Sequence, residues 1–193
     1  MAKGIRLIAG LGNPGSSYAE TRHNAGFRFI EQLISRTGGS LKAESKFSGL
    51  AAKVNIAGQD VWLLKPETFM NNSGDSVAAA ARFYKVEPEE VLVVHDELDL
   101  SPGTVRLKTG GGHGGHNGLR DIIPKLGSKD FVRLRIGIGH PGSASQVSSY
   151  VLKKAPSAEH ELTDEAIARA ITHIEDIVVG DHERVMNDLH THS

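Results

Sequence analysis

The sequence predicts an α/β fold: a single three-layer domain in which helices flank a twisted mixed β-sheet. Short apolar runs typical of buried strands alternate along the chain with longer segments whose apolar residues recur at helical spacing. The 193 residues also fit the usual length of one domain, and no internal repeat or low-complexity linker divides them. We therefore expect residues 1–193 to form one domain, with residues 186–193 as a frayed tail.

The first half of the chain contains three predicted strands and two predicted helices. A mostly apolar run at residues 5–11 stops at the turn residues 12–15, which is typical of a buried strand. Residues 21–38 carry apolar side chains at helical spacing and end at a pair of glycines, so they predict a helix. A β-hairpin is expected over residues 50–56 and 61–64, and Ser73 can then cap a helix that extends to Tyr84.

The second half alternates in the same way. Strands are expected at residues 91–94, 103–108 and 131–138. Residues 117–126 predict a helix, although Pro124 conflicts with its continuation and leaves its end open. A long amphipathic helix over residues 156–179 and a short helix over residues 183–189 complete the predicted elements.

The composition excludes several kinds of chemistry. The chain has no cysteine, which excludes disulfides, a thiol nucleophile, thiolate metal ligands and iron–sulfur clusters. No apolar run approaches the roughly 20 residues of a membrane span. Because the N-terminus leads straight into a strand-like segment without a signal peptide, we expect a cytoplasmic protein without a membrane partner.

The formal net charge of -1 conceals an uneven distribution. Residues 103–140 contain seven basic side chains and two acidic ones, whereas residues 156–193 contain two basic and nine acidic side chains. This division indicates one face suited to a polyanion and another that repels it. The alternative is that these charges only cover solvated faces, and charge alone favours that alternative.

The most informative histidine is His23, at the start of the first predicted helix. The apolar strand at residues 91–94 runs directly into His95, Asp96 and Glu97, and strand ends in α/β sheets often carry catalytic carboxylates. A carboxylate that accepts the Nδ1–H of a histidine fixes its tautomer and leaves Nε2 free to take a proton. The alternative is that Asp96 only caps the turn that follows.

Three asparagines occupy similar positions next to predicted strands or turns: Asn13, Asn71 and Asn117. An amide offers a donor and an acceptor without charge, which suits the binding of a carbonyl, a peptide group or a water molecule. Each asparagine alone is more typical of a turn or a cap. Three of them beside a candidate histidine–aspartate pair favour a polar cleft.

Two other patterns point elsewhere. The glycine runs at residues 10–15 and 110–115 match a dinucleotide fingerprint by letter, but residues 14–17 delay any helix after the first run, and no ribose-binding acid follows the second at the expected distance. The His-x-x-His pair at His113 and His116, together with His95, Asp96 and Glu97, could be interpreted as a metal site. Histidines on a flexible glycine loop are weaker evidence for a metal than ligands on a helix face.

The sequence resembles the bacterial-type peptidyl-tRNA hydrolases over nearly its whole length. The resemblance depends on six motifs in the order of the family, at residues 10–15, 21–26, 66–74, 95–99, 110–119 and 135–142. It implies a single α/β domain with a mixed sheet, in a monomeric cytoplasmic enzyme that needs no metal or other cofactor.

The resemblance also implies an activity and a set of site residues. The family hydrolyses the ester between a peptide and the 3′-terminal ribose of tRNA, so the implied partner is peptidyl-tRNA with its acceptor stem and 3′ CCA end. His23 would activate water and Asp96 would orient it. The implied substrate-binding residues are Asn13, Tyr18, Met70, Asn71, His116 and Asn117, and Lys108 and Arg135 would bind a phosphate near the tRNA 5′ end.

Two other functions stay open at this point. A nucleic-acid-binding module without catalysis could share the fold and the basic segment, although it would not need a histidine–aspartate pair among asparagines. A metal-dependent hydrolase could use His95, His113 and His116. Turnover of N-acetyl-aminoacyl-tRNA argues against the first function, and activity that survives a chelator argues against the second.

Overall fold

The computed structural model describes residues 2–191. Within these residues the strands form one seven-stranded sheet in the order β2-β3-β4-β1-β5-β7-β6. Strands β1, β4, β5 and β7 are parallel to their neighbours at the centre, whereas β2, β3 and β6 pair in antiparallel fashion. The strand bounds are Leu7–Gly10 (β1), Lys42–Glu44 (β2), Gly49–Ile56 (β3), Gln59–Pro66 (β4), Val91–Glu97 (β5), Val105–Thr109 (β6) and Val132–Gly137 (β7).

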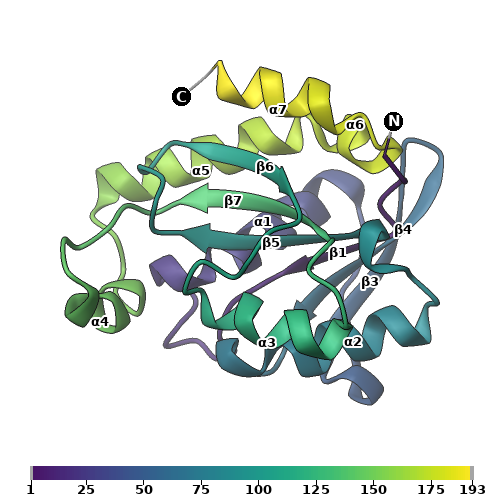
Figure 1. Ribbon diagram of the computed structural model, residues 1–193, viewed down its shortest axis with the longest axis horizontal. Coiled ribbons are helices and arrows are strands. Elements are labelled where there is room, and N and C mark those ends of the chain that lie inside the picture. The colour runs from purple at the N-terminus through teal and green to yellow at the C-terminus, as the bar shows by residue number, and fades with distance from the viewer. Residues whose placement is uncertain (1, 192–193) are drawn as a thin grey trace.

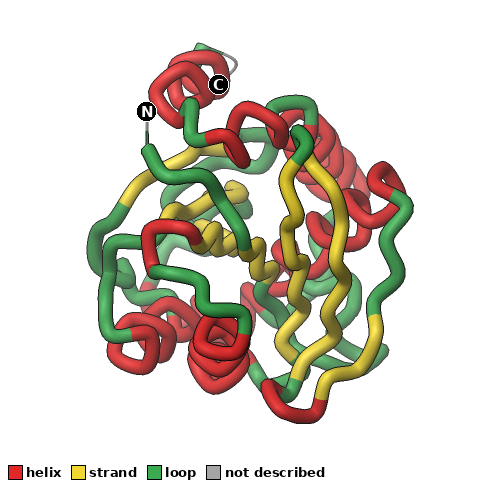
Figure 2. Tube along the Cα trace, turned by 90° about the vertical axis from the view of Figure 1, so that its right-hand side faces the viewer, coloured by secondary structure: helices red, strands yellow, loops and turns green. Residues whose placement is uncertain are grey.

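Helices cover both faces of this sheet, so the predicted three-layer α/β class is confirmed (Figure 1). Helices α1, α5, α6 and α7 pack on one face, and α2 and α3 pack on the other. Figure 2 shows the N-terminal segment beside the C-terminal helices, where Ala2 N donates to Gly180 O. The helix bounds are Ala25–Thr37 (α1), Ser73–Phe83 (α2), Asn117–Leu126 (α3), Val147–Val151 (α4), Ser157–Ile171 (α5), Ile174–Val179 (α6) and His182–His190 (α7).

The central strands are apolar on both faces because helices cover them on both sides. Leu92 and Val94 of β5 contribute to the core beneath α1 and α5, whereas Val91 and Val93 contribute to the core beneath α2 and α3. The alternation of side chains along a strand thus divides β5 between two hydrophobic cores. Among residues 2–191, none of the helices is long and apolar enough to cross a membrane.

Several predicted boundaries differ from the structure. The expected helix over residues 156–179 is two helices, α5 and α6, although its apolar period continues from Ile171 to Ile174 and no glycine or proline marks the break. Ser73 is the first residue of α2 and not its cap, since its hydroxyl donates to Met70 O at 2.6 Å. Helix α3 continues past Pro124 to Leu126, and Pro124 costs it one backbone hydrogen bond close to its end.

The expected tail fraying from residue 186 is wrong as far as His190. Helix α7 extends from His182 to His190, and the buried side chains of Val185 and Leu189 hold it against the sheet. The helix expected over residues 183–189 is thus present, and its apolar burial keeps its second half ordered where fraying was expected. Residues 192–193 of the expected tail lie outside the described residues.

A glycine brings the first helix close to the central strands. A Cβ atom at Gly26 would lie 2.4 Å from both Leu11 N and Val94 O, so only glycine allows this approach. The start of α1 is thereby held at the carboxyl ends of β1 and β5. The 3-10 turn Arg22–Asn24, which precedes α1, is placed above the same edge of the sheet.

Candidate active site

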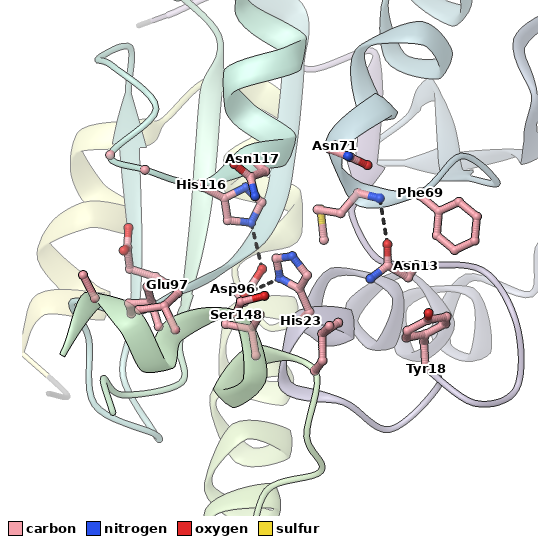
Figure 3. A pocket seen from close by; sticks show the side chains of 18 residues that line it. Asn13, Tyr18, His23, Phe69, Asn71, Asp96, Glu97, His116, Asn117 and Ser148 are labelled. Atoms are coloured by element: carbon pink, nitrogen blue, oxygen red, sulfur yellow. Dashed lines mark hydrogen bonds and ion pairs between the residues drawn. The ribbon is translucent and has the colours of Figure 1, made fainter. Parts of the chain in front are cut away.

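A cleft with a volume of about 480 Å³ opens at the carboxyl ends of the central strands. In open α/β sheets this edge is where ligands bind, because loops and helix N-termini converge there. The cleft wall comes from β5, from the turn before α2, from the start of α3, from the loop after β1 and from α4 (Figure 3). It includes all eight residues expected as catalytic or substrate-binding: Asn13, Tyr18, His23, Met70, Asn71, Asp96, His116 and Asn117.

The centre of the cleft is a carboxylate between two imidazoles. Asp96 Oδ2 lies 2.8 Å from His23 Nδ1, and Asp96 Oδ1 lies 2.8 Å from His116 Nε2. The histidines come from different layers, since His23 precedes α1 and His116 precedes α3. The carboxylate at the end of β5 thus connects the two faces of the sheet, as the dashed lines in Figure 3 show.

The backbone of α3 determines the tautomer of His116. Its Nδ1 caps the helix by accepting hydrogen bonds from Gly118 N at 3.1 Å and from Leu119 N at 3.3 Å. Because Nδ1 is the acceptor, the ring proton is on Nε2, which donates to Asp96 Oδ1. The other carboxylate oxygen accepts from His23 Nδ1, so the neutral His23 ring keeps Nε2 unprotonated.

The electrostatics of the cluster favour a charged Asp96. Burial opposes ionisation, but His23 and His116 together hold the pKa of Asp96 far below its usual range. Burial also lowers the pKa of His23, but the charge of Asp96 and its hydrogen bond outweigh this effect, so the pKa of His23 is raised. The structure therefore places an imidazole of increased basicity at a cleft.

Asn13 is held by two neighbours. Its side-chain Oδ1 accepts from Met70 N at 2.7 Å, and its backbone N–H and C=O bond to the amide of Asn24 at 2.8 and 2.9 Å. With Oδ1 engaged, the Nδ2 donor of Asn13 has no hydrogen-bond partner within residues 2–191. The buried Asn24 was not predicted, although it lies directly after His23 in the sequence.

The remaining wall combines amides with apolar side chains. Asn71 is exposed in the 3-10 turn that precedes α2, and Asn117 is exposed as the first residue of α3. Tyr18 and Phe69 meet edge to face at one end of the cleft, with ring centroids 6.1 Å apart. Opposite them, α4 and the residue after it contribute Val147, Val151 and Leu152.

This arrangement can be compared with known proteins. The sequence model of a family described as Peptidyl-tRNA hydrolase matches residues 7–193. The chain belongs to this family.

Proteins named peptidyl-tRNA hydrolase are similar to the chain along its whole length. One from Saccharophagus degradans is 59% identical over 188 residues, which cover 97% of this chain and 95% of that protein. One from Teredinibacter turnerae is 56% identical over 192 residues, which cover 99% of this chain and all of that protein. The crystal structure of peptidyl-tRNA hydrolase from Acinetobacter baumannii superimposes with a TM-score of 0.96 at 54% identity, covering 100% of this chain and 98% of that structure.

In this peptidyl-tRNA hydrolase fold, the two residues expected to bind tRNA phosphate lie outside the cleft wall. Lys108 is exposed on β6, and Arg135 is on β7. The strand register pairs Lys108 with Arg133 and Arg106 with Arg135, so these four basic side chains share one face of the sheet. Arg135 Nε also donates to Glu97 Oε1 at 2.9 Å, and Glu97 lines the cleft, so the basic face borders it.

The donor set of this family member does not fit a metal ion. His23, Asp96 and His116 have ligand atoms within 4.8 Å of one another. A metal would need the lone pair of His116 Nε2, which would move the ring proton to Nδ1, against the two backbone N–H groups that point at it. Of the alternative ligands, His95 is buried and His113 Nδ1 accepts from Gly115 N.

A third histidine lies behind the carboxylate. His95 is buried, its Nδ1 donates to Asp96 O at 2.7 Å, and its ring meets His116 edge to face at 4.9 Å. Burial and the neighbouring His116 lower the pKa of His95 to about 4, so this ring stays neutral. The burial of His95 was not predicted. The signal that could have indicated it is the apolar run at residues 91–94, which His95 directly continues in β5.

We expect the free energy of unfolding to fall as the pH drops from 6.5 to about 4, because the unfolded chain then binds a proton that folded His95 rejects. His23 affects stability in a different pH range. Because its pKa is raised in the folded protein, its contribution to the free energy of unfolding is fully present below pH 6.5 and is lost as the pH rises through the pKa of folded His23. Denaturant titrations of His95→Gln should show a smaller slope between pH 6.5 and 4. An unchanged slope would contradict this assignment, and some slope should persist because the pKa of His182 is lowered too.

Proposed function

We propose that this chain, a peptidyl-tRNA hydrolase by family, cleaves the ester between a peptide and the 3′-terminal ribose of tRNA, with His23 activating the attacking water. The observation that carries this proposal is the His23–Asp96 pair at 2.8 Å, which leaves His23 Nε2 as a base beside an amide-lined cleft. The role is the recycling of tRNA from peptidyl-tRNA that ribosomes release prematurely. The protein acts as a cytoplasmic monomer without a metal.

The reaction needs one base and one site for developing negative charge. His23 Nε2 takes a proton from water as the water oxygen attacks the ester carbonyl, and the resulting imidazolium is stabilised by Asp96. The Nδ2 donor of Asn13 is positioned by its bonds to Met70 and Asn24 to stabilise the oxyanion. When the carbon–oxygen bond to the ribose breaks, His23 returns its proton to the ribose oxygen.

The cleft also favours a substrate whose α-nitrogen is part of a peptide bond. Asn71 and Asn117 offer neutral amides that can pair with the backbone of a peptide, and Met70 and Tyr18 offer apolar contact. An unblocked aminoacyl-tRNA has an ammonium group in place of the peptide amide, so one asparagine side chain would be left without its hydrogen bond, at a cost of roughly 1–3 kcal/mol. The enzyme should therefore prefer peptidyl-tRNA and N-blocked aminoacyl-tRNA.

The activity is tested by incubating the protein with N-acetyl-aminoacyl-tRNA and measuring the release of free tRNA. Turnover is expected, and aminoacyl-tRNA with a free ammonium group should react more slowly. The same assay after treatment with a chelator should give the same rate, since the His116 tautomer does not suit a metal. Tight tRNA binding without turnover would favour the nucleic-acid-binding alternative, and loss of activity with the chelator would favour the metal-dependent alternative.

We expect the double variant Lys108→Ala/Arg135→Ala to raise KM and to flatten its dependence on salt concentration. Each lost phosphate contact removes about one unit from the slope of log affinity against log salt. kcat should change little, because neither side chain lines the cleft. The measurement is KM for the variant and the unsubstituted protein over a range from low to high salt. If log KM depends on log salt with the same slope in both proteins, the phosphate contacts lie elsewhere.

A further inference from the structure

Arg22, next to His23 in the sequence, directs its side chain to another part of the fold. The guanidinium carbon lies 3.8 Å from the centre of the Tyr150 ring, and Nη1 donates to Tyr150 O at 3.0 Å. Nη2 lies 3.7 Å from Glu159 Oε2 in α5, and the side chain is only 10% exposed. A single side chain thus contacts both α4 and α5.

The backbone around Arg22 strengthens this attachment. Arg22 N donates to Lys153 O at 3.0 Å, and Thr21 pairs with Lys154 in an isolated antiparallel bridge. On the other side, the Tyr150 hydroxyl donates to Ile138 O at 2.6 Å, just beyond β7. Residues 150–154 are therefore hydrogen-bonded both to the turn that carries His23 and to the residue after β7.

Residues 140–149, which precede this attachment, have few side-chain interactions with the rest of the fold. Within the described residues, no side-chain hydrogen bond joins residues 140–149 to another part of the fold, since their side-chain bonds link only Gly142 with His140, Ser143 with Ser145, and Ser149 with Gln146. Yet α4 and the residue after it present Val147, Val151 and Leu152 to the cleft. This apolar wall is attached to the rest of the fold through Tyr150 and through the backbone contacts of Lys153 and Lys154.

We propose that Arg22 is a positioning residue that holds the α4 wall against the His23 turn and thereby sets the affinity for the acyl group of the substrate. The inference rests on the proposed function, because it assigns the α4 wall to the peptide part of peptidyl-tRNA. Apolar lining gives affinity only when it is preorganised. Arginine suits the task because its planar guanidinium stacks on a ring and donates hydrogen bonds at the same time.

The test compares Arg22→Gln with the matched variant Arg28→Gln. Arg28 pairs with Asp164 of α5, and its side chain is 12% exposed, so it controls for the loss of a largely buried arginine that bonds to α5. Affinity is measured for a peptide joined to tRNA through a non-hydrolysable amide and for deacylated tRNA. For Arg22→Gln, we expect the peptide-bearing analogue to bind about tenfold more weakly and deacylated tRNA to bind unchanged.

The pH profile of kcat separates positioning from chemistry. Its midpoint should not move in Arg22→Gln, since the His23–Asp96 pair does not involve Arg22. Unchanged affinity for the analogue, an equal loss for deacylated tRNA, or the same loss in Arg28→Gln would each overturn the proposal. If Arg22→Gln does not fold, Tyr150→Leu removes the ring on which Arg22 stacks and the hydroxyl that bonds to Ile138 O, and it should also weaken binding of the analogue.

Failure of the proposed function has a separate signature. If the unsubstituted protein binds the analogue but does not cleave N-acetyl-aminoacyl-tRNA, the hydrolytic mechanism is wrong. The affinity comparison between the two arginine variants still decides the role of Arg22 in that case.

Discussion

The His23→Ala variant should lose nearly all turnover while it keeps its affinity for tRNA. A positioned general base contributes about 10²- to 10⁴-fold to the rate, and no other imidazole in the described cleft has a ring nitrogen without a hydrogen-bond partner. His116 cannot replace it, because both of its ring nitrogens are engaged, one by α3 and one by Asp96. kcat with N-acetyl-aminoacyl-tRNA and the Kd for deacylated tRNA give the two required measurements.

A control histidine shows whether any loss is specific. His173 lies between α5 and α6, on the opposite side of the sheet from α2 and α3, and its nearest acidic partner is Asp188 at 3.9 Å. His173→Ala should therefore retain its activity. Cleavage by His23→Ala near the rate of the unsubstituted protein would reject His23 as the base, and loss of tRNA binding with the turnover would point to a structural role.

The predicted fold depended on apolar periodicity, and it is accurate where tertiary contacts agree with that periodicity. Both strands of the β3–β4 hairpin and the start of β5 lie where alternation and apolar runs place them. Strand β2 was not predicted, because two of its three residues, Lys42 and Ala43, are exposed and leave no apolar pattern. Helix α4 was missed because it is short: Val147, Tyr150 and Val151 have helical spacing, but five residues are too few to show a repeating period.

The site was predictable to the extent that strand ends and helix starts meet at one edge of the sheet. The pairing of His23 with Asp96, 73 residues apart, followed from that topology. The second histidine on Asp96 did not, because the glycine run before His116 gives no periodicity from which its direction can be inferred. Likewise, the interaction of Arg135 with Glu97 depends on the side-by-side register of β5 and β7, which the sequence does not specify.

The Asp96→Asn variant should lower kcat severely, about 10⁴-fold where an amide imposes the wrong histidine tautomer. The α3 backbone keeps the proton of His116 on Nε2, so the carbonyl oxygen of the introduced amide would have to face His116. The amide nitrogen would then face His23 Nδ1, and this ring would have to carry its proton on Nε2, where the base is needed. The remaining activity should titrate at lower pH, because Asp96 raises the pKa of His23 and active His23 is the neutral form.

If the loss of activity in Asp96→Asn comes from the wrong tautomer of His23, its size should depend on His116, whereas a loss caused only by the missing charge should not. In a His116→Ala background the introduced amide is free to turn its oxygen toward His23, since the donor that fixed its orientation is gone. The Asp96→Asn substitution should therefore cost less in that background than in the unsubstituted protein, a non-additivity that a double-mutant cycle on kcat measures. Equal costs in both backgrounds would mean that charge alone, and not the proton on His116 Nε2, connects Asp96 to the base.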